Sequence, residues 1–182
     1  MTMAANASLE AEARPKPTEG EGVHVWNLAA TVLDPEVPVL TIEDLGVLRS
    51  AEVVDGRAVV TITPTYSGCP AMDVMREDVL TVLHDAGYED AEVRLVLAPA
   101  WTTDWMSEAG KAKLEKFGIA PPTGHAAVAG RAGGPVRVAM SVKCPQCGSL
   151  DTTESSRFGS TACKALYTCN ACHEPFDFFK VI

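Results

Sequence analysis

Cys144-Pro145-Gln146-Cys147 and Cys169-Asn170-Ala171-Cys172 are two CxxC pairs in the last quarter of the sequence. Two thiolates spaced by two residues can bind one tetrahedral ion from a single tight turn, and a second such turn completes the four ligands. Twenty-one residues separate the pairs, slightly more than is usual for a four-cysteine zinc site. The pairs predict a structural zinc ribbon, in which Gly148 lets the first turn close and protein thiolates fill every position.

Other interpretations of these cysteines stay open from the residues alone. Four thiolates also suit an iron site, and the two pairs could be unrelated turns. The residues from Cys169 to His173 spell CxxCH, the haem attachment signal, but haem would leave the first pair unused and would require export. We expect His173 to lie near the metal or at the surface, and Cys163 to belong to the ribbon core.

Length and composition indicate one ordinary domain and one small one. The chain has 182 residues, of which 47% are hydrophobic. It contains no apolar run of transmembrane length, and its N-terminus lacks the apolar core of a signal peptide. Six cysteines in a chain that is not exported favour metal binding over disulfides. We therefore expect a cytoplasmic protein with no membrane partner.

The acidic charge of the chain restricts the class of partner. The formal net charge is −9, and residues 23–118 carry seven basic and 16 acidic groups. Nucleic-acid binding requires clustered lysine and arginine, so this balance argues against a nucleic-acid partner. A protein with a basic face suits the acidic segment better, and a homodimer is compatible with it.

Composition divides the chain into four parts. Residues 1–22 are rich in Ala, Glu, Pro and Gly, which predicts a disordered tail. Proline and glycine recur through residues 119–135, which predicts a linker. The linker would separate a body, residues 23–118, from the zinc ribbon, residues 136–182.

The body alternates helical and strand patterns. Asp55-Gly56 between two β-rich runs is a strong hairpin signal, and Pro70 and Gly87 are typical of the start and stop of a helix. These signals predict an α+β fold in which helices cover a small mixed sheet. The expected elements are a helix at 23–32, strands at 47–54 and 58–63, a helix at 70–86, a strand at 91–98 and a helix at 105–117.

Two apolar patterns near the end of the body make more specific predictions. Val93, Leu95 and Leu97 alternate with Glu92 and Arg94, as expected for a strand with one buried face. Trp101 and Trp105 are compatible both with buried core residues and with an exposed docking patch.

Cys69 is a candidate functional thiol, because it lies at or just before the first turn of the helix at 70–86. The positive end of a helix dipole lowers a thiol pKa, whereas Asp73 in the same turn opposes this effect. The alternative is an inert, half-buried cysteine.

Four acidic residues crowd one proline-stiffened segment. Carboxylates placed together can act as acid/base groups or bind hard metal ions, but loop acids are often solvated or cap turns. Both interpretations stay open from the residues for Asp34, Glu36, Glu43 and Asp44.

These motifs together resemble a known family. Asp34-Pro35-Glu36, Asp44-Leu45-Gly46 and Ser67-Gly68-Cys69-Pro70 are similar to the iron–sulfur assembly domain of SufT-like proteins. The added ribbon, with the run from Phe158 to Leu166 and the later Glu174-Pro175-Phe176-Asp177, resembles the PaaD (PaaJ) family. Members of that family are accessory subunits of bacterial phenylacetyl-CoA oxygenase (epoxidase).

The resemblance implies a role in the maturation or assembly of this oxygenase during aerobic phenylacetate degradation, through handling of iron–sulfur clusters. It assigns Cys69, Asp34 and Glu36 to transient binding of iron or a cluster. Its implied partners are the oxygenase subunits or iron–sulfur assembly proteins. The sequence lacks both the ligand sets of a di-iron helical bundle and a glycine-rich dinucleotide motif, so we expect no catalysis by this chain alone. The alternative is a metal-stabilised protein–protein adaptor without cluster chemistry.

Overall fold

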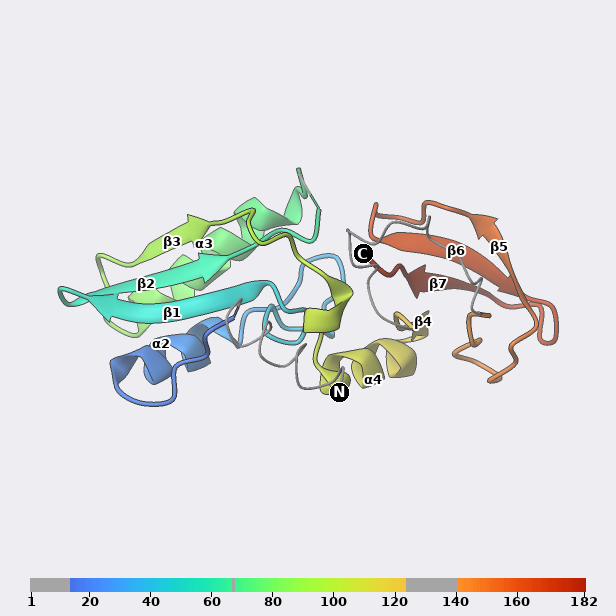
Figure 1. Ribbon diagram of the computed structural model, residues 1–182, viewed down its shortest axis with the longest axis horizontal. Coiled ribbons are helices and arrows are strands. Elements are labelled where there is room, and N and C mark those ends of the chain that lie inside the picture. Colours follow the sequence, from blue (N-terminus) through green and yellow to red (C-terminus); the bar gives the residue numbers. More distant parts are fainter. Residues whose placement is uncertain (1–13, 67, 124–140) are drawn as a thin grey trace, which may run out of the picture. The chain divides into compact units, whose positions relative to one another are not determined.

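The computed structural model describes residues 14–66, 68–123 and 141–182, and the chain divides into two compact units (Figure 1). The first unit runs to Trp101 and includes Trp105–Ser107. The second unit comprises Thr102–Asp104 and Glu108–Ile182. Each unit has its own sheet.

The first unit is a three-stranded mixed sheet with two helices. The sheet has the order β1-β2-β3, with β1 antiparallel and β3 parallel to β2. Helix α2 packs against β1 and α3. This arrangement confirms the predicted α+β fold with a small mixed sheet. The elements are α2 (Glu21–Ala29), β1 (Leu48–Val54), β2 (Arg57–Ile62), α3 (Ala71–Asp85) and β3 (Glu92–Leu95).

The predicted hairpin and long helix are both confirmed. Asp55 and Gly56 form the turn between β1 and β2 with φ angles of 52° and 79°, values that a two-residue hairpin turn requires. Helix α3 starts directly after Pro70. Its buried face consists of Ala71, Met72, Met75, Val79 and Leu83.

Strand β3 is shorter and more exposed than its alternation predicts. It ends at Leu95, and the side chains of Leu95 and Leu97 are 55% and 62% exposed. The predicted buried face is therefore wrong for these two leucines. Strand β3 is at the edge of the sheet and has a neighbouring strand on one side only, so its outer part is not covered.

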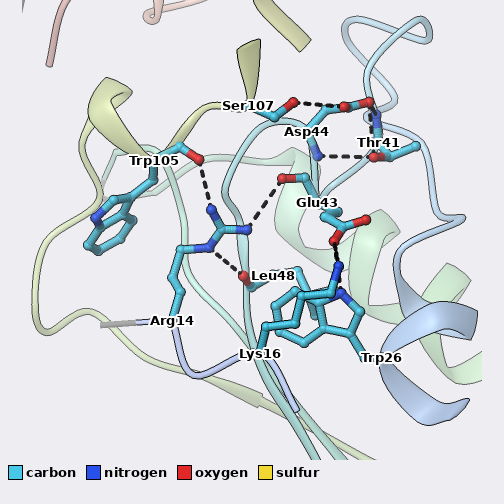
Figure 2. Close-up of polar contacts among 9 residues, drawn as sticks. All are labelled: Arg14, Lys16, Trp26, Thr41, Glu43, Asp44, Leu48, Trp105 and Ser107. Atoms are coloured by element: carbon cyan, nitrogen blue, oxygen red, sulfur yellow. Dashed lines mark hydrogen bonds and ion pairs between the residues drawn. The ribbon is translucent and has the colours of Figure 1, made fainter. Parts of the chain in front are cut away.

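The folded part of the first unit begins before residue 23, so the tail prediction is wrong for residues 14–22. Helix α2 starts at Glu21, and the Arg14 guanidinium donates hydrogen bonds to the carbonyls of Leu48, Trp105 and Glu43 at 3.0, 2.8 and 3.4 Å (Figure 2). These carbonyls come from distant parts of the chain, which composition does not reveal. Residues 1–13 lie outside the described residues.

Both tryptophans belong to the core of the first unit. Trp101 and Trp105 are 5% and 7% exposed. The Trp101 indole N–H donates to the carbonyl of Leu45 at 3.0 Å, and the guanidinium of Arg49 lies 4.3 Å from the Trp105 ring centroid. The docking-patch alternative is thereby excluded.

The second unit is a four-stranded sheet preceded by a helix. The strand order is β4-β7-β6-β5, with β5, β6 and β7 antiparallel and β4 parallel to β7. None of the described helices is both long and apolar enough to cross a membrane. The elements are η1 (Thr103–Trp105, shared between the units), α4 (Glu108–Phe117), β4 (Ile119–Ala120), β5 (Thr152–Ser156), β6 (Lys164–Cys169) and β7 (Pro175–Phe179).

The boundary expected at residue 118 lies elsewhere in the structure. Helix α4 and strand β4 both belong to the second unit, and Ile119 and Ala120 pair with β7 instead of starting a linker. Burial of Leu114 and Ala120, both at most 1% exposed, accounts for this attachment. The rest of the expected linker is described only to residue 123, and residues 136–140 of the expected ribbon also lie outside the described residues.

Candidate functional site

The four cysteines of the two CxxC pairs meet at one point of the second unit. Their sulfur atoms all lie within 4.8 Å of one another. The Sγ atoms of Cys144 and Cys172 are 3.8 Å apart, and those of Cys147 and Cys169 are 3.6 Å apart. A tetrahedral zinc ion with Zn–S bonds of about 2.3 Å requires sulfur separations of about 3.8 Å. The donor set and its geometry therefore fit a tetrahedral thiolate-bound ion.

Each pair forms the same kind of turn, or knuckle. The backbone N–H of Gly148 donates to the carbonyl of Cys144, and that of His173 donates to the carbonyl of Cys169, both at 2.9 Å. Gly148 and His173 adopt φ angles of 77° and 64°. His173 thus occupies the same position in the second knuckle as Gly148 does in the first, with the same backbone conformation. Among the described residues, the group that can hold a metal ion consists of the four cysteines and does not include His173.

The two knuckles rest on the apolar core of the second unit. Cys144 and Cys169 are fully buried beside Ala120, Val142 and Phe176. This burial limits the access of water and competing ligands to half of the thiolates.

At the second knuckle, backbone groups favour ionised sulfur at Cys169, whereas burial and the neighbouring cysteine side chains raise the pKa of Cys172. A hydrogen bond from the backbone of Cys172 lowers the pKa of Cys169 to about 6 against the effect of burial, and the backbone of Ala171 acts in the same direction. A thiolate is the form that binds a metal.

The sixth cysteine is separate from this centre. Cys163 is buried, as expected for a ribbon core residue, and its sulfur lies 3.0 Å from the hydroxyl of Thr161. Its carbonyl accepts a hydrogen bond from the N–H of Lys180. Cys163 therefore serves the packing of the second unit.

Cys69 lies in the loop between β2 and α3 of the first unit and is half-buried. Its N–H donates to the carbonyl of Tyr66, and its carbonyl accepts from the N–H of Met72, both at 3.3 Å. Pro70 is the N-cap of α3, so Cys69 lies one position before the N-cap and two before the first helical residue, Ala71. The sequence located this thiol correctly at the helix start.

The pKa of Cys69 is raised, whereas the helix dipole was expected to lower it. Burial is the main cause, and the negative charges of Glu36 and Asp34 raise the pKa further. Hydrogen bonds from Ala71 and Tyr66 oppose them without reversing the shift. The sequence left the balance of opposing effects on this pKa open, and in the structure burial and two acids outweigh the end of the helix.

The charges of Asp34 and Glu36 act on Cys69, although more than 30 residues of sequence separate them from it. Asp34 is 6% exposed, and its Oδ1 accepts from the N–H groups of Glu36 and Val37, both at 2.7 Å. Asp34 therefore holds its own loop in shape and also acts on the thiol electrostatically. Among the described residues, the three groups form no cluster tight enough to hold a metal ion by themselves.

The other two acids of the segment have structural roles (Figure 2). The Asp44 carboxylate accepts hydrogen bonds from Thr41 and from the hydroxyl of Ser107, the latter at 2.9 Å. Glu43 accepts from Lys16 at 2.6 Å and from the Trp26 indole at 2.9 Å. Burial raises the pKa of Glu43, but these partners lower it by more.

Sequence reasoning missed two contributors to these sites. Tyr66 directly precedes the Ser67-Gly68-Cys69-Pro70 motif, and nothing in the sequence indicates its hydrogen bond to the thiol. Arg14 was assigned to the tail. It lies with Lys16 in a segment that is poor in apolar residues, and this composition gives no information about a distant partner.

Comparisons with known proteins match both units. Residues 23–95 match the family described as "Iron-sulfur cluster assembly protein", and residues 131–180 match the "PaaD zinc beta ribbon domain". The "Fe-S protein maturation auxiliary factor" of Porphyromonas gingivalis is 40% identical over 92 residues, which cover 50% of this chain and 87% of that protein. A crystal structure of a domain of unknown function from Bacillus anthracis aligns with a TM-score of 0.47 and 29% identity, covering 51% of this chain and 90% of that chain.

A further relative spans both units. The D subunit of the "Putative 1,2-phenylacetyl-CoA epoxidase" of Escherichia coli (strain K12) is 45% identical over 158 residues, which cover 87% of this chain and 92% of that protein. Identity at this level over nearly the whole length of both chains is evidence of common descent. The protein therefore belongs to the family of the 1,2-phenylacetyl-CoA epoxidase D subunit, with an iron–sulfur cluster assembly domain followed by a PaaD zinc ribbon.

Proposed function

We propose that this chain is a non-catalytic accessory subunit that helps to mature or assemble phenylacetyl-CoA epoxidase in aerobic phenylacetate degradation. Its family and the maturation factor similar to its first unit support this role. The observation that carries the proposal is the proximity of Glu36 and Asp34 to the Cys69 thiol, whose pKa burial and these two charges raise. A thiolate and carboxylates are all potential ligands of iron. Its proposed location is the cytoplasm.

In this role Cys69 holds iron or an iron–sulfur cluster transiently. A cluster takes four ligands, most often thiolates, and this loop offers one cysteine. The client or a cluster carrier would supply the remaining ligands, which suits transfer better than storage. Because the Cys69 pKa is raised, the thiol must lose a proton when iron binds. The negative charges of Asp34 and Glu36 disfavour a free thiolate but would favour the bound cation.

The ribbon has a separate role in this proposal. Cys144, Cys147, Cys169 and Cys172 would hold one zinc ion, and the thiolates leave no open position for a substrate. When bound, this ion would stabilise the fold of the second unit. No catalytic residue is assigned to it.

The second candidate is a metal-stabilised adaptor that docks the epoxidase subunits without cluster chemistry. Two observations favour it: the raised pKa of Cys69, and the lack of a preformed metal cluster at this loop among the described residues. In the adaptor, Cys69 is an inert half-buried residue.

Replacement of Cys69 separates the two candidates. A strain that carries Cys69→Ser as its only copy should make folded, zinc-containing protein but should grow poorly on phenylacetate. Asp73→Asn, at an exposed position in the first turn of α3, is the matched control and should support normal growth. Normal growth of the Cys69→Ser strain would favour the adaptor.

A further inference from the structure

The loop between β5 and β6 exposes a large aromatic side chain. Phe158 is 68% exposed, more than any other large hydrophobic residue that the structure describes. The loop lies at the end of β5 that is opposite to the zinc knuckles. Exposed aromatic residues in a fixed conformation are typical anchors of protein interfaces, because they bury a large area at a low entropy cost.

Local contacts fix the backbone on both sides of Phe158. The hydroxyl of Ser156 donates to the Phe158 carbonyl at 2.8 Å. The Gly159 N–H donates to the carbonyl of Lys164 at 2.9 Å, and a Cβ at Gly159 would lie only 2.9 Å from Oδ1 of Asp177. A side chain at Gly159 would therefore require Asp177 and Lys164 to shift. The backbone that carries Phe158 is thus held in place by local contacts before a partner binds.

Two basic residues accompany the exposed ring: Lys180 lies beside it, and Arg157 precedes it in the sequence. The Lys180 Nζ lies 4.6 Å from the Phe158 ring centroid and donates to the carbonyl of Arg157 at 3.0 Å. In the part of the chain that the structure describes, no carboxylate forms an ion pair with Arg157 or Lys180. The sequence contains no Asp or Glu between Arg157 and His173. We call Arg157, Phe158 and Lys180 the ribbon tip.

We infer that the ribbon tip is a docking surface for an acidic protein partner, in which Phe158 enters an apolar pocket and Arg157 and Lys180 meet carboxylates at its rim. This inference rests on the proposed function and places the pocket on the phenylacetyl-CoA epoxidase. Nucleic acid is the less suitable partner. Residues 141–182 carry four basic and four acidic groups, far from the basic surface that phosphate binding requires.

Binding of the purified epoxidase of the same organism to the zinc-loaded full chain tests the inference. Phe158→Ser should weaken binding about 30-fold, the loss typical of an interface anchor. Leu150→Ser is the matched control, because Leu150 is 60% exposed but lies beside the first knuckle, at the other end of β5. It should bind within about twofold of wild type.

A charge reversal gives an independent measurement. Arg157→Glu should weaken binding about tenfold at low salt, and the loss should shrink as ionic strength rises. Lys116→Glu makes the same change of charge at an exposed position in α4 and should have little effect. Zinc content and circular dichroism establish that each variant is folded.

Several outcomes would overturn the inference. The first is equal affinity of Phe158→Ser and wild type for the epoxidase, and the second is an equal loss of affinity in Phe158→Ser and Leu150→Ser. The others are self-association of the chain, or binding of a labelled DNA duplex, that depends on Phe158. If wild type does not bind the epoxidase, the docking surface is refuted. The growth test with Cys69→Ser then decides separately whether the proposed function survives.

Discussion

At the scale of single residues, the two knuckles require the same backbone conformation at positions that carry different side chains. Gly148 and His173 both have positive φ angles, which glycine adopts freely and other residues adopt at a cost of about 1–2 kcal/mol. A Cβ at Gly148 would meet only the Lys143 Cε atom, at 3.7 Å, so strain and not collision limits this position.

A reciprocal pair of substitutions tests this account of the knuckles. Gly148→Ala should lower the free energy of unfolding of the second unit by about 1 kcal/mol, and His173→Gly should raise it by a similar amount. Chelator competition for zinc and denaturant unfolding measure both effects. Loss of zinc binding in His173→Gly would instead indicate that His173 is a zinc ligand.

The electrostatics of Cys69 predict how its reactivity depends on its neighbours. Glu36→Gln removes a negative charge that disfavours the thiolate, so the pKa should fall and the thiolate fraction at pH 8 should rise. Alkylation of Cys69 in zinc-loaded protein should then be faster, on the order of twofold, with the difference vanishing at pH well above the pKa. Peptide mass spectrometry measures the rate at this cysteine.

Glu52→Gln, an exposed change in β1, is the control for this measurement and should leave the rate unchanged. An unchanged or slower rate in Glu36→Gln would mean that Glu36 does not act on Cys69 in solution.

At the scale of elements, the segment before α2 joins parts of the first unit that are distant in sequence. Arg14 reaches three carbonyls, and hydrogen bonds from a charged group stabilise by about 1.5–3 kcal/mol in favourable cases. Because the side chain is partly buried, we expect Arg14→Ala to lower the free energy of unfolding of the first unit by about 2 kcal/mol. Denaturant unfolding measures this loss.

Lys16→Ala is the control for Arg14. Lys16 pairs with Glu43, but its side chain is 57% exposed, and exposed ion pairs contribute at most about 1 kcal/mol. Similar losses in the two variants would contradict a specific role for the Arg14 contacts.

Elements set by local sequence were predictable, and elements set by distant contacts were not. The Asp55-Gly56 turn, the start of α3 after Pro70 and the CxxC pairs all have signals within a few residues. Strand β4 has two residues and exists only through pairing with β7, and the attachment of Arg14 depends on carbonyls that any sequence provides. The raised pKa of Cys69 likewise depends on acids that only the fold brings near it.

At the scale of the whole molecule, the chain consists of two units whose boundary lies before α4. A fragment of residues 108–182 should therefore bind zinc with a more stable fold than residues 136–182, which lack the buried Leu114, Ile119 and Ala120. Each such side chain contributes on the order of 1 kcal/mol. Thermal unfolding with and without a chelator compares the stability of the two fragments. Equal stability would mean that α4 and β4 do not contribute to the fold of the second unit.

We propose that the first unit handles iron through Cys69 while the second unit holds zinc. Anaerobic reconstitution of the full chain with iron, sulfide and glutathione, which can supply the remaining thiolates, tests it most directly. Wild type should retain iron and sulfide, and Cys69→Ser should retain almost none, with equal zinc in both proteins. Equal iron and sulfide in wild type and Cys69→Ser would contradict the claim.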